Sequence, residues 1–291
     1  MSDIVKLFYR NYIEDATLTA SSTAGSLSKE NLKKYKLSKI WRTTGLSSEY
    51  ISADLGQSYG LNMVAIWGHN LTTAAQIRIR IGNDPTFATN LYDQTVYAWQ
   101  PVYGYDEGGY DEGGFDGLPI LTDYNGFPSY TLVELDQSYN ARYIRIDFTD
   151  ASNPDGYIQA GYLATGYMIQ PTYDVSVPSE LPSWCDPSDQ YETESSDLWV
   201  CKKRKYRVAT YIFEFLSKSE ALITFDDLSR IVGGSKPIIV LYFSDSEIYK
   251  YRYAMYGLLT NAKQGLIKRQ LRQNTEAYSF GISLTMRELI Q

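Results

Sequence analysis

Apolar and polar residues alternate with a period of two over much of the first half of the chain. Residues 61–67 form an almost uninterrupted apolar run, which is typical of a buried strand. In residues 76–81 isoleucines alternate with arginines, which predicts one apolar and one cationic face. Residues 130–135 and 143–148 alternate in the same way. Many short strands with little helical period predict a jelly-roll β-sandwich over residues 1–175, in a chain that is mainly β.

A low-complexity patch interrupts this pattern. Residues 105–109 and 110–114 are tandem Tyr-Asp-Glu-Gly-Gly pentapeptides, and Phe-Asp-Gly follows them. Glycine pairs favour backbone conformations that strands avoid, and neighbouring carboxylates repel each other. The patch is therefore expected to be a solvent-facing insertion.

One weak helix signal lies in the same half of the chain. Residues 28–38 predict a short helix with Ser28 as its cap. Leu32, together with Tyr35 or Lys36, is expected to face inward.

The composition changes after residue 175. Residues 176–197 are rich in Pro, Ser, Asp and Glu, which predicts a linker without regular structure. Residues 198–291 predict a smaller α+β domain with the element order β-α-β-β-β. Its strands are expected at residues 205–216, 237–243, 249–259 and 276–287.

The helix of this second domain is the clearest in the chain. It is expected over residues 220–232, with Ser217 or Ser219 as its cap, and Gly233-Gly234 should end it in a left-handed conformation. Its expected buried stripe consists of Leu222, Phe225, Leu228, Ile231 and Val232.

Composition and charge exclude several classes of protein. The 291 residues are 44% hydrophobic and include 27 tyrosines, which indicates a packed globular protein with two domains. A net charge of -7 argues against nucleic acid as a partner. The N-terminus has no leader-peptide pattern, and the longest apolar stretch is far too short to cross a membrane. We therefore expect no membrane partner and synthesis in a cytosol.

Residues suited to catalysis are scarce. His69 is the single histidine, so a multi-histidine metal site is excluded, and we expect His69 and Asn70 to hydrogen-bond a turn at a strand end. Phosphate-binding, dinucleotide-binding and nucleophile-elbow motifs are absent. Cys185 and Cys201 are expected to be unlinked thiols, although one bridge outside the cell remains an alternative. The sequence thus predicts a protein that is not an enzyme.

The carboxylates of the glycine-rich patch leave two alternatives open. Paired carboxylates hydrolyse glycosides, but a solvated loop is poorly suited to raising a carboxyl pKa. The same acids could bind Ca²⁺, although their spacing differs from that of a calcium loop, so we expect no cofactor and no metal. These acids are Asp106, Glu107, Asp111 and Glu112.

Aromatic residues around the patch are the candidate binding residues. Exposed Tyr and Trp offer a large contact area to a protein or to a sugar. The alternative is that they cover their own sheet. The candidates are Tyr97, Trp99, Tyr103, Tyr105 and Tyr110.

A basic run at residues 202–205 precedes a predicted strand. It is expected to be a solvated strand entry, or else to pair with acids on a neighbouring subunit.

Several motifs between residues 15 and 170 resemble the discoidin family, also described as coagulation factor 5/8 C-type or galactose-binding-like. They are Ala20-Ser-Ser, Trp41-Arg-Thr-Thr, Tyr50-Ile-Ser-Ala-Asp-Leu-Gly, Leu61-Asn-Met-Val-Ala-Ile-Trp-Gly-His-Asn and Ala141-Arg-Tyr-Ile-Arg-Ile-Asp. The resemblance implies an eight-stranded jelly roll in which Trp41 and Asp54-Leu55-Gly56 are core and turn positions. The histidine-arginine constellation of fucose-binding members has no counterpart in this sequence.

A second resemblance concerns the whole chain. The jelly roll is followed by a strand, a helix and a strand, marked by Glu-Phe-Leu at residues 214–216 and Gly-Gly-Ser-Lys-Pro-Ile at residues 233–238. This arrangement is similar to minor tail proteins of tailed bacteriophages. This resemblance implies a structural virion protein of a tail tip or baseplate, made in the bacterial cytoplasm. Its partners would be other tail proteins and copies of itself in a ring. The alternative is a carbohydrate-binding module for adhesion to the host surface, with Trp99 and residues 105–110 as its platform.

Overall fold

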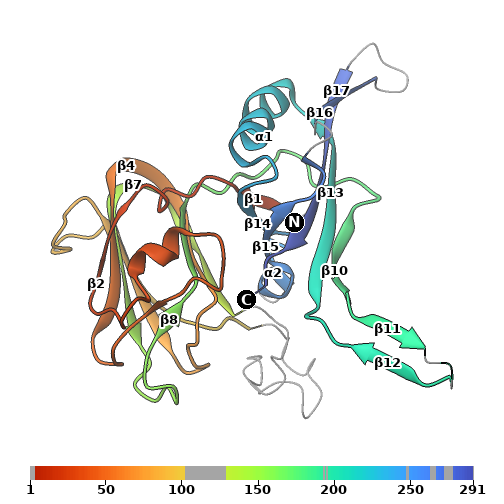
Figure 1. Cartoon of the computed structure of the whole chain (residues 1–291). Coiled ribbons are helices and arrows are strands. Elements are labelled where there is room, and N and C mark those ends of the chain that lie inside the picture. The colour runs from red at the N-terminus through yellow and green to blue at the C-terminus, as the bar shows by residue number, and fades with distance from the viewer. Residues whose placement is uncertain are drawn as a thin grey trace. The chain divides into compact units, whose positions relative to one another are not determined.

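The protein divides into two compact β-rich units (Figure 1). The computed structural model describes residues 4–101, 129–192, 194, 196–246, 249–262, 267–271 and 278–290. The jelly-roll unit comprises Arg10–Ile169 and Glu247–Arg252, and the α+β unit comprises Met1–Tyr9, Gln170–Ser246 and Tyr253–Ile290. In the part of the chain that is described, no helix has the length and apolar character needed to span a membrane.

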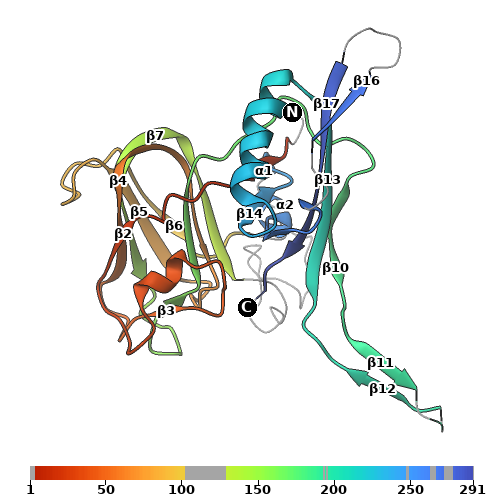
Figure 2. The same ribbon diagram turned by 45° about the horizontal axis from the view of Figure 1, so that its top comes forward.

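The jelly-roll unit is built on an antiparallel sheet with the strand order β2-β4-β7-β5-β6, and β9 pairs with β4. A separate two-stranded sheet joins β3 and β8. The long strands β4 and β7 curve over the top of this unit (Figures 1 and 2). The strands are β2 (Thr17–Ala20), β3 (Trp41–Arg42), β4 (Glu49–Trp67), β5 (Gln76–Gly82), β6 (Tyr92–Tyr97), β7 (Tyr130–Thr149), β8 (Gln159–Ala160) and β9 (Tyr162–Gly166).

Strand β7 unites two segments that the sequence predicts as separate strands, residues 130–135 and 143–148. Three of the residues between them stay paired with β4, because Tyr139, Asn140 and Ala141 lie opposite Leu61, Gly60 and Tyr59. Register shifts in β4 on both sides of this stretch let the ribbon bend without ending.

The core of this unit follows the predicted alternation. Ile77, Ile79 and Ile81 of β5 are at most 1% exposed, and the arginines between them face outward. Trp41 is fully buried, as the family resemblance implies. Gly56 has a φ of 80° and donates its N–H to Asp54 Oδ1 at 2.8 Å. The resemblance implies a turn here, but these residues lie inside β4, where the register with β7 shifts between Asp54 and Tyr59.

The predicted helix over residues 28–38 is one short 3-10 helix, η1 (Lys29–Lys33). Ser28 caps it by accepting a hydrogen bond from the N–H of Glu30, and Leu32 is buried, as expected. Tyr35 and Lys36 are exposed, so the prediction that one of them faces inward is wrong. The cause is that the backbone becomes extended at Lys34 and the helical face does not continue.

The α+β unit contains a sheet with the order β1-β14-β15-β17-β13-β10, and β16 pairs with β17. Its first strand comes from the N-terminus, because β1 pairs with β14. The first nine residues therefore belong to this unit, whereas the sequence places them in the jelly roll. The strands are β1 (Lys6–Phe8), β10 (Glu180–Cys185), β11 (Asp189–Glu192), β12 (Leu198–Cys201), β13 (Tyr206–Leu216), β14 (Pro237–Leu241), β15 (Met255–Leu259), β16 (Ile267–Leu271) and β17 (Tyr278–Glu288).

The segment predicted as a linker, residues 176–197, contains strands β10 and β11, so the prediction of no regular structure there is wrong. Strand β10 is at the edge of its sheet and tolerates Pro182 because its register shifts between Glu180 and Ser183.

The predicted helix over residues 220–232 is present as η2 (Glu220–Phe225) followed by α1 (Asp226–Val232). Ser217 Oγ accepts from the N–H of Glu220, and Glu220 accepts from the N–H of Ser217, which is a reciprocal cap. Gly233 ends the helix with a φ of 50°.

The buried stripe of this helix differs from the prediction at two positions. Phe225, Leu228 and Val232 are buried as expected, but Leu222 is 47% exposed and Ala221 is buried in its place. Ile231 is only partly buried. The first part of the helix has π geometry, which turns its faces away from the α-helical register. Phe225 packs on Phe213 of β13 with 5.3 Å between ring centroids, so this helix covers the sheet.

The strand predicted at residues 249–259 is only half correct. Tyr249–Tyr253 forms the short helix α2, and the strand β15 begins at Met255. Strands β13, β14 and β17 lie within two residues of their predicted bounds at every end.

Candidate functional site

The structure describes two of the five predicted aromatic residues, and they differ in exposure. Tyr97 of β6 is 56% exposed, but Trp99 is only 6% exposed and donates its indole N–H to the carbonyl of Leu71 at 2.7 Å. The prediction of Trp99 as a stacking platform is therefore wrong, because the side chain belongs to the core. Tyr103, Tyr105, Tyr110 and the acids of the glycine-rich patch lie outside the described residues.

His69 has a structural role, as the sequence predicts. The side chain is buried, its Nδ1 accepts from the N–H of Leu71 at 3.3 Å, and its Nε2 lies 3.2 Å from the hydroxyl of Thr131. Burial lowers the pKa of His69 to about 4, so the imidazole is neutral at physiological pH.

Asn70 holds the neighbouring turn. Its Nδ2 donates to Asp155 Oδ2 at 2.8 Å and to the carbonyl of Tyr157 at 3.0 Å, and its Oδ1 accepts from the N–H of Gln159 at 2.8 Å. These hydrogen bonds use both the nitrogen and the oxygen of the Asn70 amide group, and they confirm the predicted turn.

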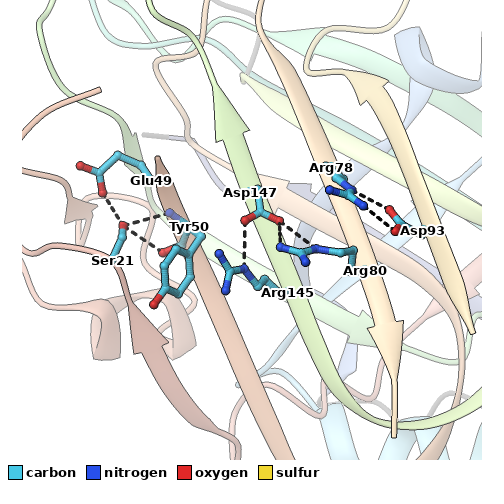
Figure 3. Close-up of polar contacts among 8 residues, drawn as sticks. All are labelled: Ser21, Glu49, Tyr50, Arg78, Arg80, Asp93, Arg145 and Asp147. Carbon is cyan, nitrogen blue, oxygen red and sulfur yellow. Dashed lines mark hydrogen bonds and ion pairs between the residues drawn. The ribbon is translucent and has the colours of Figure 1, made fainter. Parts of the chain in front are cut away.

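A row of paired charges lies on the outer side of strands β5, β6 and β7 (Figure 3). Because side chains alternate along a strand, the positions between the buried isoleucines all face outward. We call this row the charged face; its members are Arg78, Arg80, Asp93, Arg145 and Asp147.

Bidentate and shared contacts fix the side chains of the charged face. Arg78 donates through Nε and Nη2 to the two oxygens of Asp93, both at 2.7 Å. Arg80 donates to Asp147 Oδ2 through Nη2 at 2.7 Å, and Arg145 Nε donates to Asp147 Oδ1 at 2.9 Å. Asp147 therefore holds two guanidinium groups side by side.

An aromatic ring supports one end of the row. The guanidinium carbon of Arg145 lies 3.7 Å from the ring centroid of Tyr50 on β4. The backbone of Tyr50 is held by a hydrogen bond from its N–H to Ser21 Oγ at 2.9 Å. The Ser21 hydroxyl in turn donates to the Glu49 carboxylate (Figure 3). Tyr50, Arg145 and Asp147 thus form a preorganised polar surface.

The charged face carries one net positive charge, because three guanidinium groups face two carboxylates. The hydrogen bonds from Arg78 hold the pKa of Asp93 below its usual value, so this carboxylate stays ionised. The local balance is opposite in sign to the net charge of -7 of the whole chain.

A hollow of about 290 Å³ lies in the loop between β5 and β6. Asn83, Asp84, Thr89, Asn90 and Leu91 line it. Asp84 shapes the loop by accepting from the N–H groups of Thr86 and Ala88 at 2.9 and 3.0 Å. Asn90 Nδ2 donates to Asp93 Oδ2 at 3.1 Å, which connects the hollow to the charged face.

One lining atom of the hollow is left without a partner. Asn90 Oδ1 is buried and accepts no hydrogen bond from the described part of the chain.

The sequence predicts only the cationic half of this face. The alternation in residues 76–81 identifies Arg78 and Arg80, but their acidic partners come from other strands. The signal for Asp147 was present, because Arg145 and Asp147 alternate with Ile144 and Ile146 in the same way. Asp93 carries no local signal of its role, since it is defined only by the pairing of β5 with β6.

Other candidate chemistry is limited. Cys185 and Cys201 are free thiols. Within the residues that the structure describes, no three His, Cys, Asp or Glu side chains are grouped so that they could hold a metal ion.

No family model matches the chain, and no curated protein matches it. Solved structures are similar to part of the chain, and three of them are the following. The lectin domain of lectinolysin, in complex with Lewis B antigen, is 12% identical and has a TM-score of 0.36, with 54% of this chain and 95% of that chain covered. The chitosan-binding module 1 of a chitosanase/glucanase from Paenibacillus sp. IK-5 is 17% identical and has a TM-score of 0.38, with 54% and 99% covered. A fucose-binding module from Streptococcus pneumoniae is 11% identical and has a TM-score of 0.37, with 54% and 95% covered.

Proposed function

We propose that the jelly-roll unit is a non-catalytic carbohydrate-binding module whose ligand lies on the charged face. The observation that carries this proposal is the fixed unit of Tyr50, Arg145, Asp147 and Arg80 on adjacent strands. Guanidinium and carboxylate groups each offer hydrogen-bonding atoms at fixed spacing, which suits the neighbouring hydroxyls of a sugar. Strands hold such groups more firmly than loops do.

Tyr97 supplies an exposed aromatic ring to the same surface. Tyr97 and Asp93 are four residues apart on β6, so their side chains leave the strand on the same side. Tyr97 lies opposite Gln76 of β5, and Gln76 is two residues before Arg78 and on the same side of that strand. An exposed ring beside fixed polar groups combines an apolar contact with orientation by hydrogen bonds.

The ligand class that fits best is an acidic sugar. The excess of one positive charge favours a carboxylate or sulfate substituent, and Arg145 reaches the surface with its guanidinium stacked on Tyr50. The hollow next to Asp93 gives room for a neighbouring sugar unit.

A glycan array followed by calorimetric titration tests this proposal. We expect binding to uronic-acid oligosaccharides that exceeds binding to neutral oligosaccharides of the same length. Arg145→Gln should weaken binding about tenfold or more, because it removes a charge-assisted donor. Arg10→Gln is the matched control, because Arg10 is an exposed arginine of the same unit outside the charged face.

Two results would contradict the proposal in different ways. If no glycan on the array binds, or if the wild type and Arg145→Gln bind with equal affinity, the charged face is not a sugar-binding site. Preference for neutral sugars with loss of binding in Arg145→Gln would keep the site and refute the acidic ligand.

A second proposal is a structural role in a bacteriophage tail tip or baseplate, where copies of the chain and other tail proteins would be the partners. The supporting observation is the hairpin of β11 and β12, which exposes large apolar side chains of the kind that dock onto proteins. These are Tyr191, Leu198, Trp199 and Val200. Electron micrographs of particles with this polypeptide labelled test the proposal, and its absence from purified particles would refute it.

A further inference from the structure

Strands β11 and β12 form a two-stranded sheet of their own, which we call the arm. In both overall views the arm extends from β10 and β13 and points away from the sheet of the α+β unit (Figures 1 and 2). Two ion pairs hold its base, Lys203 with Asp189 at 2.5 Å and Lys205 with Asp186 at 3.4 Å. The arm itself is defined by four antiparallel residue pairs, from Asp189 with Cys201 to Glu192 with Leu198.

Large apolar side chains lie on both faces of the arm. Tyr191 and Trp199 lie opposite each other on one face and are 61% and 69% exposed. Leu198 and Val200, at the alternate positions, lie on the other face and are 61% and 47% exposed. An isolated two-stranded hairpin is marginally stable in water, and exposed apolar groups of this size favour association.

The outer edge of β12 is open. Within the described residues β12 pairs only with β11, so the backbone groups on its other side are available to a further strand. Main-chain pairing with an added strand is a general mode of protein association.

The charges along the arm decide which strand fits that edge. Acidic residues precede β12, namely Glu192, Glu194 and Asp197, and the basic residues 202–205 follow it. When two copies of β12 run antiparallel, the acidic stretch of each lies beside the basic stretch of the other. A parallel arrangement places like charges together, and pairing through β11 brings acidic residues together.

We propose that β12 pairs with β12 of a second copy of this chain about a two-fold axis, which gives a four-stranded sheet. The interface is isologous, because each copy supplies the same acidic and basic stretches to the other. This inference rests on the assembly role proposed above and names a second copy as the partner of the arm. It does not depend on carbohydrate binding.

Sedimentation velocity of the full chain with charge-reversed variants tests the inference. One variant carries Lys202→Glu and Arg204→Glu, and the other carries Glu192→Lys and Glu194→Lys. All four side chains are exposed and lie outside the two ion pairs at the base of the arm. We expect the wild type to form dimers and each variant alone to dissociate at least about tenfold more readily, because like charges meet at both ends.

Mixing the two variants provides the decisive control. Opposite charges then meet at both ends, so the mixture should form dimers again, as heterodimers. Loss of association through misfolding would not be restored by mixing, and circular dichroism of each variant should match that of the wild type. A monomeric wild type, or variants that dimerise as well as the wild type, would overturn the inference.

The outcomes separate this inference from the assembly role. A wild type that remains monomeric and is still found in purified particles would refute pairing through β12 and leave the structural role in place. A wild type that forms dimers but is not found in purified particles would support pairing through β12 and refute the structural role.

Discussion

Arg207 and Glu288 form a buried ion pair that joins the ends of β13 and β17. Arg207 Nε donates to the two carboxylate oxygens at 2.9 and 3.0 Å, and the N–H of Arg207 donates to Glu288 Oε2 at 3.0 Å. Arg207 Nη2 also donates to the carbonyl of Ala254 at 2.9 Å. The two side chains are 4% and 1% exposed, so neither charge is solvated by water. Each partner therefore depends on the other for its stability in the fold.

Glu288→Gln should destabilise the α+β unit by about 3–5 kcal/mol, because it leaves the Arg207 charge buried without its counter-ion. Urea unfolding followed by tryptophan fluorescence measures this change. Arg230→Gln is the control, since Arg230 forms an exposed pair with Asp227 and should cost less than about 1 kcal/mol. Equal effects of the two substitutions would show that the buried pair is not stabilising.

The stability of the jelly-roll unit should depend on His69 between about pH 4 and 6.5. Burial lowers the pKa of His69 from 6.5 to about 4 in the folded protein, whereas the unfolded chain keeps the higher value. In this window the unfolded state binds the additional proton, so the stability contribution of neutral His69 is complete above pH 6.5 and falls as the pH is lowered. The total loss is on the order of 3 kcal/mol.

Urea unfolding of the wild type and of His69→Gln at pH 7 and pH 4.5 isolates this effect, because other titrating groups are common to both proteins. The wild type should lose more stability than the variant between the two pH values. Identical pH dependence in the two proteins would contradict a buried neutral imidazole.

The jelly roll was predictable because its strands are governed by local alternation. Ile77, Ile79 and Ile81 give β5 its buried face from sequence alone. The linker prediction failed because local composition does not report strand pairing. Pro182 is compatible with β10 only because that strand is at an edge and its register shifts there. The pairing of β1 with β14 joins residues more than 200 positions apart, which no local pattern encodes.

The candidate site was predictable only where a pattern along one strand defines it. The cationic side of β5 follows from alternation, but the partners Asp93 and Asp147 are set by the strand order. Trp99 was misassigned because an aromatic near a polar loop has the same local sequence whether it points outward or inward. Its burial depends on Leu71 and His69, which come from another part of the chain.

Gly257 of β15 is required by the close approach of β17. A Cβ atom at this position would lie 2.2 Å from the carbonyl oxygen of Arg287, which is backbone and cannot move aside without separating the strands. Gly257→Ala should therefore destabilise the α+β unit by roughly 1–3 kcal/mol or more. Gly234→Ala is the matched control, because its nearest contacts would be 3.6 and 3.7 Å away. Thermal unfolding compares the two, and a Gly257→Ala protein as stable as Gly234→Ala would refute the close approach.

Tyr97 and Trp99 are two residues apart but should give opposite results when truncated. Trp99→Ala removes a buried ring and leaves the carbonyl of Leu71 without its donor, so it should cost about 3–5 kcal/mol of stability in the jelly-roll unit. Tyr97→Ala should change stability by less than about 0.5 kcal/mol, because the ring is 56% exposed, and should instead weaken binding of an acidic oligosaccharide. Tyr167→Ala, at a site that is 50% exposed in the same unit, should change neither property. Thermal unfolding and calorimetric titration of the three variants separate a core ring from a contact ring. If the Trp99→Ala protein unfolds like the wild type and no longer binds sugar, Trp99 belongs to the binding surface and not to the core.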